Sequence, residues 1–335
     1  MVVGLDVGGT KTNATVLADD GTFLVDHMVE TPSCVRDGPA AAIGAIGAAM
    51  RHALDVAGLA HDAVLAVGLD TPGPASATGV ISSKGSTNFS EPVWWGYDIR
   101  AAVEADLHLP VIYNNDGNAA ALYAHERCFG AEAAKRSSVA AIVGTGLGGG
   151  VIEGGRVIKG ASGMAGELGH IQIPMAGLLG PEQAMPRCNC GVSGDVESVA
   201  SLTGIQNNLL PYWLSRYPDH ALHAQASIAD AAKLVRGLAE RGDEMSKRIF
   251  EQQALAIGRL FTIASNFNDP DAYFIGGGVV ETAPHFRDWF LGLVSESTEL
   301  RPEQRAVAKF AVVEDLDMAG ARGAAMAALH AIRGT

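Results

Sequence analysis

One stretch decides the fold of this chain: Val111-Ile112-Tyr113-Asn114-Asn115-Asp116-Gly117-Asn118-Ala119-Ala120. An apolar, β-branched run leads into a polar turn, and a helix of small residues is predicted over 118–124. Asp116 is therefore expected to lie half buried between a strand end and a helix start, where open α/β sheets place their ligands. Two interpretations stay open. Asp116 is a general base that takes a proton from a ligand hydroxyl, or Asp116 or Asn118 caps the helix.

Composition and charge limit the class of protein. The chain has 335 residues, of which 48% are hydrophobic and 18% charged, as in a globular protein with room for two lobes. Its formal net charge of −13 disfavours nucleic acid as the main partner, because phosphate backbones require a basic face. ATP remains compatible with this charge, since backbone N–H groups and a metal ion hold its phosphates.

The sequence also indicates a compartment. The first residues show no signal-peptide pattern, and no apolar run approaches the roughly 18 residues of a membrane span. Four cysteines in a chain of this length do not indicate a disulfide framework. We therefore expect a cytoplasmic protein with no membrane partner.

Hydrophobic periodicity predicts alternating strands and helices. Strands are expected over 2–7, 12–17, 22–29, 64–69, 138–143, 150–153, 272–275 and 308–313, and another starts at 111. Long helices are expected over 38–57, 98–106, 243–266, 283–297 and 318–332. The segments 82–97 and 160–194 are expected to be irregular.

Two strand-rich regions, each followed by helices, predict an α/β protein whose two similar lobes face each other across a cleft. The expected division is a small N-terminal lobe over 1–119, on which a C-terminal helix at about 315–335 packs back, and a large lobe over 120–314.

The first glycine motif is Asp6-Val7-Gly8-Gly9-Thr10-Lys11, directly after a predicted strand. Glycines let a phosphate approach the backbone, and the Thr10 hydroxyl adds a donor. Asp6 is a candidate to hold Mg²⁺ through water. The alternative is a plain hairpin turn.

A second glycine motif is Gly144-Thr145-Gly146-Leu147-Gly148-Gly149-Gly150. A dinucleotide-binding loop of the Rossmann type must open a helix, but here the chain continues as a strand. We therefore predict a second hairpin phosphate cradle. Two such hairpins, one per lobe, would grip a nucleotide tail from both sides.

A third region combines Gly166-Glu167-Leu168-Gly169-His170 with Cys188-Asn189-Cys190 and Glu197. Two cysteines one residue apart and an upstream histidine indicate either Zn²⁺ ligands or free thiols in a turn. Glu167 and Glu197 are either acceptors for ligand hydroxyls or solvated and capping residues.

Taken together, these motifs resemble the ROK family of sugar kinases and repressors. The resemblance covers most of the chain and includes Asn115-Asp116-Gly117-Asn118-Ala119 and Gly276-Gly277-Gly278. It implies an α/β, two-lobe actin-like (ribonuclease H-like, hexokinase-type) fold with a central cleft. It also implies ATP-dependent phosphorylation of a hexose at its 6-hydroxyl, with Asp116 as general base.

The resemblance assigns further roles to residues. Sugar-binding positions would be Gly73, Asn88, Asn115, Asp116, Glu167, His170 and Glu197. Phosphate-binding positions would be Gly8, Gly9, Thr10, Lys11, Gly144, Thr145, Gly146, Gly148 and Gly149, with Asp6 beside them, and Gly277 and Gly278 would lie near the adenosine. Lobe closure would exclude water and suppress ATP hydrolysis.

One departure from the family pattern concerns zinc. The family site would be His170, Cys188, Cys190 and a third cysteine, at the position where this chain has Asp195. An aspartate oxygen is an acceptable zinc ligand, so one expectation is that Zn²⁺ still binds, with lower affinity than at the family site. The other is that the site is metal-free and held by hydrogen bonds.

The resemblance leaves several alternatives. Glucose is the first candidate sugar, and N-acetylglucosamine, N-acetylmannosamine, mannose and fructose are the others. The donor is ATP or polyphosphate. A homodimer or homotetramer is expected. A sugar-sensing transcriptional regulator is the weaker alternative, because the first strand starts at residue 2 and the chain is acidic.

Overall fold

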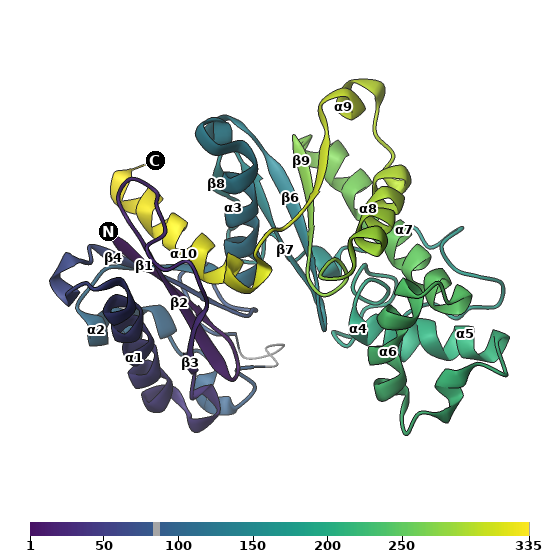
Figure 1. Ribbon diagram of the computed structural model, residues 1–335, viewed down its shortest axis with the longest axis horizontal. Coiled ribbons are helices and arrows are strands. Elements are labelled where there is room, and N and C mark those ends of the chain that lie inside the picture. The colour runs from purple at the N-terminus through teal and green to yellow at the C-terminus, as the bar shows by residue number, and fades with distance from the viewer. Residues whose placement is uncertain (83–87, 335) are drawn as a thin grey trace. The chain divides into compact units, whose positions relative to one another are not determined.

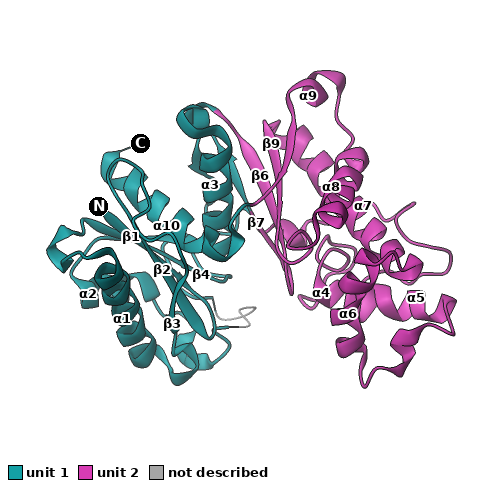
Figure 2. Cartoon of the chain, viewed as in Figure 1, with its two compact units in different colours: residues 1–135, 150–166, 314–335 teal, residues 136–149, 167–313 magenta. Residues whose placement is uncertain are grey.

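The computed structural model describes residues 1–82 and 88–334, and the chain divides into two compact units. Unit 1 comprises residues 1–135, 150–166 and 314–335, and unit 2 comprises 136–149 and 167–313 (Figure 2). The predicted boundary after residue 119 falls inside helix α3 (Asp116–Phe129), which lies wholly in unit 1. The C-terminal helix α10 (Leu316–Arg333) also belongs to unit 1.

The sheet of unit 1 has the strand order β3-β2-β1-β4-β5 (Figure 1). Its strands are β1 (Val2–Val7), β2 (Lys11–Leu17), β3 (Val29–Pro32), β4 (Ala66–Thr71) and β5 (Val111–Asn115). β1 pairs antiparallel with β2 and parallel with β4, and β4 pairs parallel with β5. The carboxyl ends of β1, β4 and β5 therefore meet at one edge of the sheet.

The predicted strand over 22–29 is wrong. β3 starts only at Val29, and within 22–28 a single bridge joins Phe23 to Leu17. Leu24 and Met28 are exposed, and the polar pair Asp26 and His27 interrupts the apolar pattern. Val25 is buried, but the next position on the same face, His27, is exposed, so the segment lacks the continuous buried face that a strand of this sheet needs.

Helices cover both faces of the sheet of unit 1. α1 (Pro39–Ala57) and α2 (Ile99–Leu107) pack on the face that carries Val3 and Leu5. α10 packs on the opposite face, which carries Val2 and Ala66, and contacts α3 as well. Side chains alternate along each strand, so even-numbered residues of β1 and β4 face α10.

The second sheet has the order β10-β9-β6-β7-β8. Its strands are β6 (Ser138–Val143), β7 (Leu147–Glu153), β8 (Arg156–Val157), β9 (Ala272–Gly276) and β10 (Lys309–Val312). β9 pairs parallel with both β6 and β10. Strand β7 runs through the division between residues 149 and 150.

The helices of unit 2 are α4 (Leu202–Gly204), α5 (Leu210–Arg216), α6 (Ile228–Glu240), α7 (Glu244–Asn268), α8 (Pro284–Ser297) and α9 (Pro302–Val307). The predicted helices at 243–266 and 283–297 are confirmed as α7 and α8. In the part of the chain that the structure describes, no helix is long and apolar enough to cross a membrane.

Candidate functional site

Helix α3 starts directly after β5, at the residue that the sequence singled out. Asn115 caps this helix, since its Oδ1 accepts hydrogen bonds from the backbone N–H groups of Gly117 at 2.8 Å and Asn118 at 3.4 Å. The residue that caps the helix is therefore Asn115, rather than Asp116 or Asn118 as the alternative interpretation predicted. Asp116 is the first helical residue and is half buried, and its Oδ1 accepts from Gly117 N at 2.7 Å.

A second acidic position lies beside this one and was missed by the sequence analysis. Asp70 is the second-last residue of β4 and stands opposite Asp6 of β1 in the strand register. Burial, followed by the charge of Asp6 and then that of Asp116, raises the pKa of Asp70 well above its usual value. Burial also raises the pKa of Asp6. The signal was present, because Asp70, like Asp6, comes directly after an apolar run and is the second-last residue of its strand.

The first glycine motif forms the hairpin between β1 and β2. Gly8 N donates to Lys11 O at 2.9 Å, and the Lys11 ammonium pairs with Glu30. A Cβ atom on Gly9 would collide with Asn88 Oδ1, so the candidate phosphate hairpin and a candidate sugar ligand are in contact. Gly73 follows β4 by two residues.

Part of the irregular segment over 82–97, residues 83–87, lies outside the described residues. Trp94 is 1% exposed and donates from Nε1 to Val35 O at 3.1 Å, so it belongs to the core.

A small cavity of about 10 Å³ lies at the end of β5. It has room for about one water molecule. Asn115, Asn118, Ser76 and Lys159 are among its lining residues. Lys159 Nζ donates to Tyr113 O at 2.6 Å, and burial lowers the pKa of Lys159. Lys159 has no sequence signal, because only the fold brings its segment to β5.

In unit 2, the second glycine motif is a turn between two strands. Gly144 N donates to Gly146 O at 2.9 Å, and β7 follows as a strand, which confirms that this is no Rossmann loop. Glu197 supports the turn, since its Oε2 accepts from Leu147 N at 2.8 Å. The Gly144 carbonyl accepts from Leu202 N at 3.0 Å.

The glycine motif Gly276-Gly277-Gly278 lies next to this turn. Gly277 follows β9, which is parallel to β6, and has φ +93°. A Cβ atom there would collide with the carbonyl of Val143, the residue before Gly144, so only glycine fits. The Gly278 carbonyl accepts from Arg236. Two candidate nucleotide-binding segments thus meet at the carboxyl ends of adjacent parallel strands.

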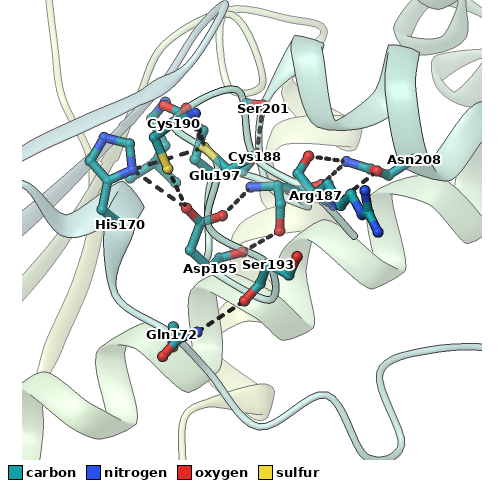
Figure 3. Close-up of polar contacts among 12 residues, drawn as sticks. His170, Gln172, Arg187, Cys188, Cys190, Ser193, Asp195, Glu197, Ser201 and Asn208 are labelled. Carbon is teal, nitrogen blue, oxygen red and sulfur yellow. Dashed lines mark hydrogen bonds and ion pairs between the residues drawn. The ribbon is translucent and has the colours of Figure 1, made fainter. Parts of the chain in front are cut away.

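The candidate zinc ligands converge in unit 2 (Figure 3). His170 Nδ1 lies 3.4 Å from Asp195 Oδ2 and 4.0 Å from Cys188 Sγ, and Cys190 Sγ lies 3.6 Å from Asp195 Oδ2. The four donor atoms are all within 4.8 Å of one another. Ligands at 2.0–2.3 Å in a tetrahedron are separated by roughly 3.3–3.8 Å, so this set fits Zn²⁺ after small adjustments.

The groups of this cluster satisfy one another electrostatically. The hydrogen bond to Asp195 raises the pKa of His170 to about 9. Burial by itself would raise the pKa of Asp195, but hydrogen bonds from His170 and Ser198 bring it below the usual value. Burial raises the pKa of Cys188, whose thiol donates to Glu197 Oε1 at 3.3 Å.

Glu167 and Glu197 differ in their local surroundings. Both oxygens of Glu197 have partners, one on the glycine turn and one on Cys188. Glu167 precedes the short helix η5 (Leu168–His170), and burial raises its pKa.

The two sheets and the glycine turns define the two-lobe actin-like α/β class. The model of the ROK family matches residues 2–331, and the chain therefore belongs to this family. A curated glucokinase from Halalkalibacterium halodurans is 31% identical over 310 residues, which is 89% of either chain.

Two solved structures support the same assignment. A ROK hexokinase from Thermus thermophilus superposes with a TM-score of 0.77 at 30% identity and covers 100% of this chain and 99% of its own. A ROK family glucokinase from Streptomyces griseus, in complex with glucose and AMPPNP, gives 0.68 at 28% identity and covers 98% of each chain.

Proposed function

We propose that this protein is an ATP-dependent hexose kinase that phosphorylates the 6-hydroxyl of glucose or a related hexose. The observation that carries the proposal is the placement of Asp116 as the first residue of α3, at the carboxyl end of β5 and beside Asp6 and Asp70. The similarity to a glucokinase and to a ROK hexokinase supports the same reaction.

Asp116 is the general base of this reaction. A base must lie within about 2.6–3.2 Å of the hydroxyl that it deprotonates. A carboxylate at the first position of a helix is stabilised by the partial positive charge of the helix N-terminus. Asn115 holds the start of α3 in place through its cap, which fixes the direction of the Asp116 side chain.

The proposed sugar ligands are Gly73, Asn88, Asn115, Asp116, Glu167, His170 and Glu197. Because Glu197 Oε2 already accepts from Leu147 N, its contribution couples the sugar ligands to the Gly144 turn. Glu167 is the stronger acceptor candidate of the two glutamates.

The nucleotide is proposed to bind to backbone groups at the glycine turns. The phosphates contact Gly8, Gly9, Thr10, Lys11, Gly144, Thr145, Gly146, Gly148 and Gly149, and the adenosine lies near Gly277 and Gly278. Asp6, which projects from near the end of β1 toward α10, is the residue that holds Mg²⁺ through water. Bound Mg²⁺ neutralises charge on the transferred phosphoryl group.

Zn²⁺ is proposed as a structural ion at His170, Cys188, Cys190 and Asp195. The fit of the four donor atoms supports it. The ion would hold the segment between His170 and Glu197, and with it the support of the glycine turn. We further propose a cytoplasmic homodimer or homotetramer, which light scattering after size-exclusion chromatography checks.

A coupled assay of ADP formation tests the function. Glucose, mannose, fructose, N-acetylglucosamine and N-acetylmannosamine are each offered with ATP, and glucose also with polyphosphate. We expect turnover with glucose and ATP that is lost in Asp116→Asn. Turnover confined to an N-acetylhexosamine would make that sugar, rather than glucose, the substrate. No turnover with any sugar would refute the proposal.

A further inference from the structure

Four polar side chains form one row across the sheet of unit 1. In the strand register, Asp6 of β1 stands opposite Asn13 of β2 and opposite Asp70 of β4, and Asp70 stands opposite Asn114 of β5. Directly opposed residues of neighbouring strands project to the same face of a sheet. The row therefore presents two carboxyl groups side by side, with one carboxamide at each end.

The row faces helix α10. Asn13 Nδ2 donates to Asp317 O at 2.7 Å, close to the start of this helix. A Cβ atom on Gly320 would lie 2.6 Å from Asp6 Oδ2, so the helix passes directly over the Asp6 carboxylate. Asp6 itself keeps part of its surface accessible, whereas Asp70 is 0% exposed. The row is thus open to solvent at Asp6 only.

Several atoms of the row lack protein partners. Among residues 1–82 and 88–334, neither carboxyl oxygen of Asp70 receives a hydrogen bond from an N–H or hydroxyl group, and its hydrogen-bonding neighbour is the carboxyl group of Asp6. Asn13 Oδ1 and Asn114 Nδ2 are likewise unpartnered, although these residues are only 6% and 2% exposed. Leaving buried polar groups unpaired is costly, and buried polar atoms without partners point to a bound group.

The chemistry of the row selects a hard cation. Two carboxylates and a carboxamide oxygen are the ligand types that Mg²⁺ and Mn²⁺ prefer. An adjacent pair of ionised carboxylates repels, and a divalent ion between them removes that repulsion. An arginine or lysine, the usual counter-charge for such a pair, is absent from the opposed positions of this row.

We propose that Asp70 binds a divalent cation directly, beside the water-mediated contact from Asp6, and so adds a ligand from β4 to the metal site. The identification of the ion as the Mg²⁺ of phosphoryl transfer rests on the proposed function. The binding of the ion itself does not, because it needs neither sugar nor nucleotide. The competing account is that the two acids share a proton and bind no ion.

The experiment measures cation binding to the full chain without nucleotide or sugar. Mn²⁺ is titrated into the wild type, Asp70→Asn, Asp6→Asn and the double variant, and free Mn²⁺ is read by electron paramagnetic resonance, with Mg²⁺ as competitor. The double variant gives the background of all other sites. Asp55→Asn, at an exposed position on α1, is the control for the lost charge.

We expect one Mn²⁺ above background in the wild type and in Asp55→Asn, and binding at least about tenfold weaker in either single variant of the row. Asp70→Asn is isosteric and removes a repulsion, so it should melt in EDTA at or above the wild-type temperature. Mg²⁺ should raise the melting temperature of the wild type but not that of Asp70→Asn.

Two results would overturn the inference. One is wild-type affinity in Asp70→Asn with loss only in Asp6→Asn, which leaves Asp6 alone at the ion. The other is no binding above background in the wild type, which supports the shared proton. If the sugar panel shows no turnover while Mn²⁺ binding follows this pattern, the cation site stands and the proposed function fails.

Discussion

The acidic clusters of the two units are built in opposite ways. In unit 2, Asp195 and Glu197 are fully engaged with His170, Cys188 and backbone groups. In unit 1, Asp70 is as deeply buried as Asp195 but, in the described parts of the chain, has no N–H or hydroxyl donor for either oxygen and faces only the carboxyl group of Asp6. Satisfied polar networks specify structure, and unsatisfied buried acids mark places where a ligand acts. We therefore interpret the cluster around Asp195 and Glu197 as a structural network and the acids around Asp70 as a candidate ligand site.

The largest expected effect is on turnover and falls on unit 1. Asp116→Asn should lower kcat by about 10²–10⁴, the usual contribution of a general base, and leave thermal unfolding almost unchanged. Steady-state kinetics and a melting curve check both parts. Near-normal turnover in a folded variant would show that Asp116 is not the base, and Asp55→Asn controls for the charge.

The next effect concerns metal binding and falls on unit 2. Protein purified without chelator should contain about one zinc per chain by elemental analysis. Asp195→Ala should weaken zinc binding by about tenfold or more, and Asp195→Cys should strengthen it, because zinc prefers thiolate. Competition with a coloured chelator measures both. Substoichiometric zinc in the wild type would leave the cluster as a hydrogen-bonded network.

A smaller effect tests the link between this cluster and the glycine turn. Glu197→Ala removes the acceptor for Leu147 N and should reduce the free energy of unfolding by about 1–3 kcal/mol and raise KM for ATP. Glu197→Gln retains one carbonyl oxygen and should lose less. Urea unfolding and kinetics give the values. Equal losses in both variants would mean that the negative charge, rather than the acceptor for Leu147, is what matters.

The smallest effect separates the two roles of Asn115. Asn115→Ala should lower stability by about 1 kcal/mol through loss of the helix cap. Asn115→Asp preserves the cap and should retain stability, but it removes the amide donor and should raise KM for the sugar. A cap without a ligand role would leave KM unchanged in the Asp variant.

The sequence predicted much of the fold, because its strongest signals are local. The strands at 2–7 and 138–143 are apolar runs followed by glycine turns, and both are confirmed with these bounds. The strand at 22–29 failed, since nothing local showed that the buried face would be interrupted at His27, between Val25 and Val29. Strand existence is read from pattern, but pairing depends on the rest of the sheet.

The site could be predicted only in part for the same reason. The glycine motifs, Asp116 and the cysteine pair are continuous in sequence, so they could be found by inspection. Asp70 becomes a candidate only through its register opposite Asp6. Lys159 reaches Tyr113 across 46 positions of the chain, and no local pattern reports such a contact.

The position of α10 has a consequence for biosynthesis. This helix follows every strand of the first sheet in chain order, and it covers the face of that sheet from which Asp6 and Asp70 project. While the ribosome is still adding residues 314–333, β1 and β4 have been made but lack their cover. Unit 1 therefore cannot complete its core until α10 has left the ribosome, and its acids remain hydrated up to that point.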